Sequence, residues 1–369
     1  NVYNVAVGYN SGTAVTTGTA NTFIGGRAGD ATTTGSTNVA VGTDALGSNT
    51  TASNNVAIGY DCLVANTTGA TNTALGTSSL ATNTTASNNT AVGHGALTAN
   101  TTGTRNNALG NLSLVANTTG DNNVALGSQT LQANTTADDN TAVGYAALNV
   151  NTTGANNTAV GKFAGLAVTT GGYNTLVGSL AGDSITTAAN NVALGYLAGS
   201  AITTGAQNTA LGSGALSSTT TGLYNIGVGY DANSSSATVT GQCTLGDTNI
   251  TNLRSNDQTI SSLSDSRDKT DVIDSPYGLD FIKTVRPVQF KWESRDGNGK
   301  DGSTRIGFLA QELLAATDGN NAVLDLVMDD NPDKLEAKYG NLLPIAIQAV
   351  QELSTALDAA LARIATLEG

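Results

Sequence analysis

Apolar and polar positions repeat with one fixed spacing along the first 250 residues of the chain. A five-residue motif, typically Asn-(Thr/Val)-Ala-(Val/Leu/Ile)-Gly, ends in a glycine that recurs every 17 residues without insertion or deletion. These marker glycines are Gly8, Gly25, Gly42, Gly59, Gly76, Gly93, Gly110, Gly127, Gly144, Gly161, Gly178, Gly195, Gly212, Gly229 and Gly246. Fifteen copies at constant spacing predict a solenoid, because each coil must stack on neighbours of the same shape.

Within one coil, the alternation of side chains predicts a short strand that ends at the marker glycine. Val39 and Val41 are expected to face one way and Ala40 the other, because successive strand residues point to opposite faces. A second apolar stretch such as Ala45-Leu46 and an Asn-Thr-Thr-Gly turn complete the coil. The asparagine of the motif is expected to form a ladder along the stack. At ~4.8 Å per coil, the predicted rod is roughly 70 Å long.

A single coil of this composition offers little apolar volume. It holds mostly one aliphatic residue, one leucine and some alanines. We therefore expect several chains to share a core, with small Ala and Gly faces allowing close approach, and we expect a homotrimer.

The composition changes abruptly near residue 263. Residues 1–263 contain 14 charged residues and no proline, whereas 264–369 contain the other 29 charges and all four prolines. The sequence therefore predicts a β-solenoid over residues 1–250, a connecting stalk over 251–263 and a small α+β domain over 264–369, in which the run Val288–Trp292 is typical of a strand.

The final domain ends in a heptad pattern that predicts a coiled-coil helix over about residues 342–368. Its seam consists of Leu343, Ala346, Val350, Leu353, Leu357, Ala360, Ile364 and Leu367. The alternative is an amphipathic helix packed on its own domain.

Charge and rare residues exclude several classes of function. A net charge of −13 disfavours nucleic acid and anionic membranes as partners, and no apolar run reaches the ~20 residues of a membrane-spanning helix. Cys62 and Cys243 are too far apart in sequence to indicate a disulfide framework, and both are expected to be small buried side chains. His94 is the single histidine, so the chain offers few residues of the types that bind metals. We therefore expect no metal site and no cofactor.

The coils resemble the left-handed parallel β-roll in the heads of trimeric autotransporter adhesins. The family motif Asn-x-x-Ala-(Ile/Val)-Gly is close to the run from Asn55 to Gly59, and the resemblance covers residues 1 to about 250. It implies a trimeric parallel β-roll, so the expected fold is mainly β, a solenoid rod followed by a small α+β domain.

Residues 264–369 resemble the intramolecular chaperone and auto-processing domain of phage tail spikes and fibres, of the endosialidase type. Five motifs occur in the family's order: Ser264–Lys269, Gly278–Ile282, Arg286–Trp292, Ile306–Glu312 and Ala349–Leu353. Asp268 stands where many members carry an apolar residue.

The resemblance implies a domain that trimerises, guides folding of the fibre before it and then cuts itself off. By position, Ser264 would be the nucleophile, Lys269 the base and Leu263–Ser264 the scissile bond. A lysine can act as a base once burial leaves its amine neutral. The activity would be a single autoproteolytic cut in cis, with no turnover on an external substrate. Asp265 and Arg267 are expected to be structural, as a local ion pair or turn.

The sequence as a whole therefore favours a structural and adhesive segment of a phage tail fibre. Such a protein is made in the host cytoplasm and functions outside the cell on the virion, with other tail proteins and a host glycan or protein receptor as partners. The alternatives are a bacterial trimeric surface adhesin and a polysaccharide-degrading tail spike; the latter needs acidic pairs in a groove, and the coils hold only scattered aspartates such as Asp138 and Asp139.

One column of aromatic residues leaves two interpretations open. A tyrosine follows the marker glycine at Tyr9, Tyr60, Tyr145, Tyr196 and Tyr230. These rings either stack on sugars at a cell surface or cap the edge of the roll. His94 shares the column and is expected to be an exposed loop residue.

Overall fold

A computed structural model describes residues 3–250, 264–291, 302, 304–333 and 335–368. The chain divides into two compact units, Asn1–Asp247 and Thr248–Gly369. The expected stalk over residues 251–263, Leu263 of the expected scissile bond and Trp292 lie outside the described residues.

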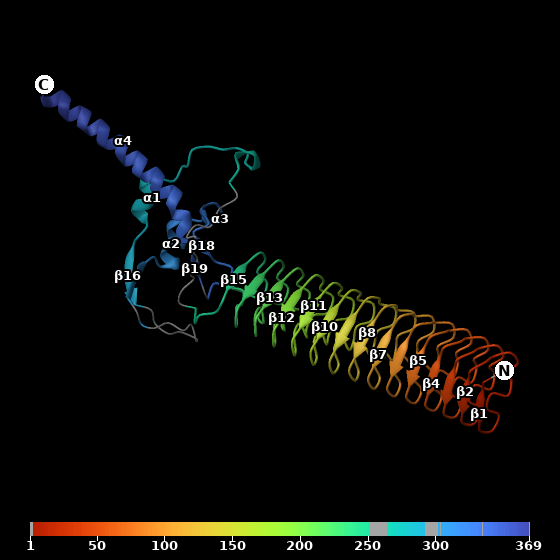
Figure 1. Cartoon of the computed structure of the whole chain (residues 1–369). Coiled ribbons are helices and arrows are strands. Elements are labelled where there is room, and N and C mark those ends of the chain that lie inside the picture. The colour runs from red at the N-terminus through yellow and green to blue at the C-terminus, as the bar shows by residue number, and fades with distance from the viewer. Residues whose placement is uncertain (1–2, 251–263, 292–301, 303, 334, 369) are drawn as a thin grey trace. The chain divides into compact units, whose positions relative to one another are not determined.

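The first unit is a parallel β-solenoid of about fourteen turns (Figure 1). Its strands form one fifteen-stranded sheet in sequence order, and each residue pairs with the residue 17 positions later, as Val5 does with Thr22. The strands are β1 (Val5–Val7), β2 (Thr22–Ile24), β3 (Val39–Val41), β4 (Val56–Ile58), β5 (Thr73–Leu75), β6 (Thr90–Val92), β7 (Asn107–Leu109), β8 (Val124–Leu126), β9 (Thr141–Val143), β10 (Thr158–Val160), β11 (Thr175–Val177), β12 (Val192–Leu194), β13 (Thr209–Leu211), β14 (Ile226–Val228) and β15 (Cys243–Leu245).

The expected alternation within a strand is confirmed. In β3, Ala40 is fully buried while Val39 and Val41 are only partly covered. The expectation that alanine faces would be shared between chains is wrong, because the central alanine of most strands is already buried within the single chain. The outward positions carry Val, Ile, Leu or Thr in nearly every strand, so the sheet face available to a partner is aliphatic rather than small.

A leucine four residues after the marker glycine fills the core opposite the strand in eight coils. Leu97 is one of these fully buried leucines, and its backbone adopts a left-handed conformation with φ +52°. That conformation costs a non-glycine residue roughly 1–2 kcal/mol, and burying a leucine offsets it with about 1.5–3 kcal/mol. The members are Leu46, Leu63, Leu80, Leu97, Leu114, Leu131, Leu148 and Leu216.

Three other coils fill the core volume opposite the strand with an aliphatic side chain seven residues after the marker glycine. In three consecutive coils glycine replaces this leucine, at Gly165, Gly182 and Gly199. Three residues further on, these coils carry Val168, Ile185 and Ile202, all buried, where most leucine coils carry asparagine. A Cβ added to Gly199 would lie 3.1 Å from Cδ1 of Ile202, so the aliphatic side chain occupies the space that a leucine takes elsewhere.

Two asparagine ladders run along the inside of the stack. In the first, which the sequence predicted, Asn38 Oδ1 accepts a hydrogen bond from the backbone N–H of Asn55 at 3.0 Å, and Asn55 Nδ2 donates to the carbonyl of Gly69. In the second, which the sequence did not predict, Asn100 Nδ2 donates to Asn83 Oδ1 at 2.9 Å. Because these amides are buried, the ladders satisfy polar groups that would otherwise be costly inside the rod.

The marker glycines are required by the close stacking of the coils. Gly42 has φ +135°, and a Cβ on it would lie 2.4 Å from the carbonyl oxygen of Gly59 in the next coil. Side chains are thus excluded by both conformation and space.

The two cysteines differ from each other. Cys62 is buried as expected, and burial raises the pKa of its thiol to about 11. The expectation for Cys243 is wrong: it is exposed, because it occupies the first, outward-facing position of strand β15.

The second unit is a small α+β domain. Its elements are the 3-10 turn η1 (Ser266–Asp268), helix α1 (Leu279–Thr284), the antiparallel pair β16 (Val288–Lys291) and β17 (Thr304–Gly307), helices α2 (Ala310–Ala316) and α3 (Asn321–Leu324), the antiparallel pair β18 (Val327–Met328) and β19 (Glu336–Ala337), the 3-10 turn η2 (Tyr339–Asn341) and helix α4 (Leu342–Glu368). Leu313, Leu326, Val327 and Ile345 lie at the centre of its core.

Helix α4 packs on its own domain only at its beginning. Its buried residues are Leu342, Ile345 and Ala349. The apolar seam residues that follow, from Val350 to Leu367, are exposed in the single chain. Packing on its own domain therefore accounts for the first two turns and leaves most of the seam uncovered.

Candidate self-cleavage site

A short turn brings the predicted catalytic pair together. Asp265 caps η1, and its Oδ1 accepts the backbone N–H of Arg267 at 2.9 Å. The Arg267 guanidinium also pairs with the Asp265 carboxylate at 2.6 Å, so both residues have the structural role expected from the sequence. These hydrogen bonds, first from the Arg267 side chain and then from its backbone, hold the pKa of Asp265 below its usual value.

The side chains of Ser264 and Lys269 meet across this turn. Lys269 Nζ lies 2.5 Å from Ser264 Oγ, with the amine as donor to the hydroxyl. A base must instead be neutral, so that it accepts the hydroxyl proton as the serine oxygen attacks. The single chain thus supplies the spacing of a Ser-Lys pair.

The surroundings of the pair are open to solvent in the single chain. Ser264, Lys269 and Asp268 are all exposed. Two large apolar side chains, Val272 and Ile273, follow the pair closely in sequence and are also exposed. The carbonyl of Leu263, which the serine would attack, lies outside the described residues.

Two long-range contacts join the other sequence motifs of the domain. The Arg286 guanidinium donates two hydrogen bonds to the Glu312 carboxylate, one of them at 3.0 Å from Nε to Oε2. The Glu352 carboxylate on α4 accepts the backbone N–H of Leu279 at 2.7 Å, at the start of α1. Gly278 makes room for that carboxylate, because a Cβ there would lie 2.3 Å from Glu352 Oε1.

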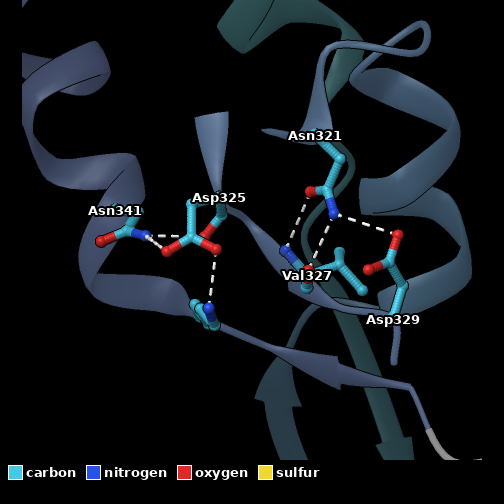
Figure 2. A network of polar contacts seen from close by, with 6 residues as sticks. Asn321, Asp325, Val327, Asp329 and Asn341 are labelled. Atoms are coloured by element: carbon cyan, nitrogen blue, oxygen red, sulfur yellow. Dashed lines mark hydrogen bonds and ion pairs between the residues drawn. The ribbon is translucent and has the colours of Figure 1, made fainter. Parts of the chain in front are cut away.

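A polar network that the sequence did not predict ties the end of α3 to the residues just before α4 (Figure 2). Asp325, in a left-handed conformation after α3, binds Lys338 Nζ at 2.6 Å and accepts from Asn341 through its backbone carbonyl at 2.6 Å. Asn321 makes reciprocal hydrogen bonds with the backbone of Val327. Its irregular spacing gave no periodic signal, so only the folded chain reveals it.

Metal chemistry and membrane crossing have no candidates in the described parts of the chain. They contain no cluster of three or more His, Cys, Asp or Glu side chains placed to hold a metal ion. None of the helices in those parts combines the length and apolar character that a membrane crossing demands.

Comparison with known proteins gives a match for part of the second unit. Residues 264–324 match the family model described as chaperone of endosialidase. No curated protein and no solved structure matches the chain. The matched segment begins at Ser264 and includes α1, α2 and α3, whereas the Ala349–Leu353 motif lies beyond it. The chain therefore carries a segment that matches the chaperone of endosialidase over residues 264–324, and an N-terminal parallel β-solenoid precedes it in the sequence.

Proposed function

We propose that the chain is a segment of a phage tail fibre that assembles as a homotrimer on the virion and takes part in host attachment. Its C-terminal domain drives trimerisation and folding and then cleaves the chain before Ser264. The observation that carries this proposal is the family match that starts at Ser264, together with the contact between Ser264 Oγ and Lys269 Nζ.

The exposed seam of α4 supports assembly of three chains. Leu343 is 63% exposed, Val350 66% and Leu367 83%, and the seam extends over the length of the helix. A heptad seam of this kind buries its apolar residues against copies of itself. Burial of one leucine or valine contributes about 1.5–3 kcal/mol, so an isolated chain leaves much stabilisation unused.

The outer face of the solenoid sheet supports the same assembly. The residue before each marker glycine is always Val, Ile or Leu, and this stripe reaches from Val7 to Leu245. The stripe matches itself almost equally well after a slip of one coil. A chaperone domain that first aligns three chains would therefore prevent pairing in the wrong register.

The cleavage chemistry follows from the pair of side chains. Lys269 in its neutral form takes the proton of the Ser264 hydroxyl, and Oγ attacks the carbonyl carbon of Leu263. The peptide bond breaks as Lys269 returns this proton to the Ser264 nitrogen, which leaves as an amine, and an ester forms between Leu263 and Oγ. Water then hydrolyses this ester and releases residues 264–369. Lys269 is exposed in one chain, so the burial that a lysine base needs would come from assembly.

The test compares the full chain with Ser264→Ala and Lys269→Ala variants. Ser266→Ala, in the same turn, and Lys283→Ala, on α1, are matched controls. Light scattering gives the mass of each product, and denaturing gels with and without boiling reveal fragments.

The wild type and both controls should form trimers and yield fragments corresponding to residues 1–263 and 264–369. The two site variants should form trimers that remain uncut. A monomeric or dimeric wild type would overturn the assembly proposal. A wild-type trimer that stays uncut, or cutting in the Ser264→Ala variant, would overturn the cleavage proposal.

A further inference from the structure

Five exposed tyrosines occupy one edge of the solenoid. We define the tyrosine edge as the residues one and two places after the marker glycines. Its tyrosines are 47–79% exposed: Tyr9, Tyr60, Tyr145, Tyr196 and Tyr230. Backbone hydrogen bonds stack this edge coil on coil, as from the N–H of Ser78 to the carbonyl of Tyr60 at 2.9 Å.

These rings are not needed to close the roll. Coils with a small residue in the tyrosine position have equally buried cores. Thr43 and Thr77 take the place of the tyrosine, and Leu46 and Leu80 follow three residues later. Leu46 and Leu80 are both 0% exposed. Burial of the core therefore does not depend on a tyrosine at this position.

The tyrosine edge also holds much of the variation between coils. Residues 3–247 contain twelve charged residues, and six of them fall on these two of the seventeen positions: Arg27, Asp44, Asp61, Lys162, Asp231 and Asp247. Interior and corner positions repeat because stacking constrains them. Chemically distinct side chains gathered at an exposed edge are what a recognition surface requires.

The same pair of side chains occurs twice on this edge. Tyr60 is followed by Asp61, and Tyr230 by Asp231. In both pairs the charge of the neighbouring aspartate, and then a hydrogen bond to it, raise the pKa of the phenol. The carboxylate of each pair offers several acceptor sites beside the ring.

An aromatic ring beside a carboxylate suits a sugar. The ring offers a flat apolar surface with little conformational entropy to lose, and the carboxylate accepts hydrogen bonds from hydroxyl groups. Tyr196 and Tyr230 lie two coils apart, ~10 Å along the stack, with Ser213 between them, so an extended polymer could follow the edge.

The charge of the rod selects the class of polymer. Residues 3–247 contain three basic and nine acidic residues, which repel a polyanionic glycan. We propose that the tyrosine edge binds an uncharged host-surface polysaccharide, whose sugar rings stack on the tyrosines and whose hydroxyls donate to Asp61 and Asp231. This inference rests on the attachment role proposed above and assigns it to named residues.

The test uses affinity electrophoresis of the assembled full chain in native gels that contain dextran, mannan or galactan, with alginate as a charged comparison. The variants are Tyr60→Ala/Tyr196→Ala/Tyr230→Ala and Asp61→Asn/Asp231→Asn. The matched control is Tyr173→Ala/Tyr224→Ala, because these two tyrosines are equally exposed but lie away from the tyrosine edge. Light scattering first establishes that each variant assembles like the wild type.

At least one neutral polymer should retard the wild type and the control variant. The triple tyrosine variant should bind about tenfold more weakly or worse, as expected when stacked aromatic anchors are removed. Absence of retardation in all three neutral gels, retardation by alginate alone, or equal loss in the control variant would overturn the inference. Any of these outcomes in a correctly assembled and cleaved trimer leaves the proposed chaperone function standing.

Discussion

Asn151 and Val168 occupy the same position in successive coils, and the second asparagine ladder stops between them. Asn151 Nδ2 donates a hydrogen bond to Asn134 Oδ1 of the preceding coil at 3.0 Å. Within the described part of the chain its own Oδ1 is buried without a hydrogen-bond donor, because the next coil presents an aliphatic side chain there. The ladder thus ends at an unsatisfied acceptor. At this point the residue four places after the marker glycine changes from leucine (Leu148) to glycine (Gly165).

The first prediction compares the end of this ladder with its middle. Asn100→Ala should destabilise the solenoid more than Asn151→Ala. Asn100 Oδ1 accepts a hydrogen bond from Asn117 Nδ2 of the next coil at 3.0 Å, whereas in the described structure Asn151 Oδ1 accepts no hydrogen bond. The difference should be about 1 kcal/mol, the net contribution of one hydrogen bond. Thermal unfolding of the full chain, followed by circular dichroism, measures it. Equal destabilisation by the two variants would contradict the assignment.

The second prediction concerns the exchange of volume between coil types. Gly199→Leu should destabilise by overpacking against Ile202, whereas Ile202→Asn should leave a cavity. The double variant recreates the leucine coil found at Leu97 and Asn100, and its glycine already has a left-handed φ of +60°. We expect a favourable coupling of about 1–3 kcal/mol in the double-mutant cycle. Additive effects of the two single changes would refute compensation.

Much of the rod could be predicted from sequence because its period is strict. The alternation around Ala40 determines which side chains face inward, and the motif asparagine gave the first ladder. The exchange between Gly199 and Ile202 was not predicted, because nothing in the spacing says which two positions share one volume. Cys243 was misassigned since its burial depends on strand parity, which cysteine chemistry does not reveal.

The second domain was less predictable from physical pattern alone. Resemblance to a family, rather than spacing, pointed to Ser264 and Lys269, and the turn capped by Asp265 explains how residues five apart come into contact. The contact between Leu279 and Glu352 spans 73 residues and follows no period. Such pairings are fixed only when the domain packs.

The third prediction tests that contact through Gly278. Gly278→Ala should displace the Glu352 carboxylate and remove its hydrogen bond to the Leu279 N–H. We expect the C-terminal domain to lose about 1–2 kcal/mol and to assemble more slowly, because α1 then loses its polar attachment to α4. Gly340→Ala is the matched control, since a Cβ there would meet nothing within 4 Å. An unchanged melting temperature for Gly278→Ala would show that the contact is dispensable.

The fourth prediction concerns acid stability and the ion pair between Arg286 and Glu312. Hydrogen bonds from Arg286, and then its charge, lower the pKa of Glu312 from its ordinary value of 4.5. A carboxylate whose pKa is lower in the folded state stabilises the fold fully above its unfolded pKa and loses that contribution as pH falls through the folded value. The wild-type domain should therefore lose this stabilisation below about pH 4.5.

Glu312→Gln cannot titrate, so it should be less stable than the wild type at pH 7, and the difference should shrink as the pH falls below about 4.5. The pair is solvent-exposed, so salt should weaken the effect by screening. Denaturant unfolding at a series of pH values measures the difference, with Asp358→Asn, an exposed carboxylate on α4, as the control. If the gap between Glu312→Gln and the wild type stays constant down to pH 3, the ion pair does not link protonation to folding.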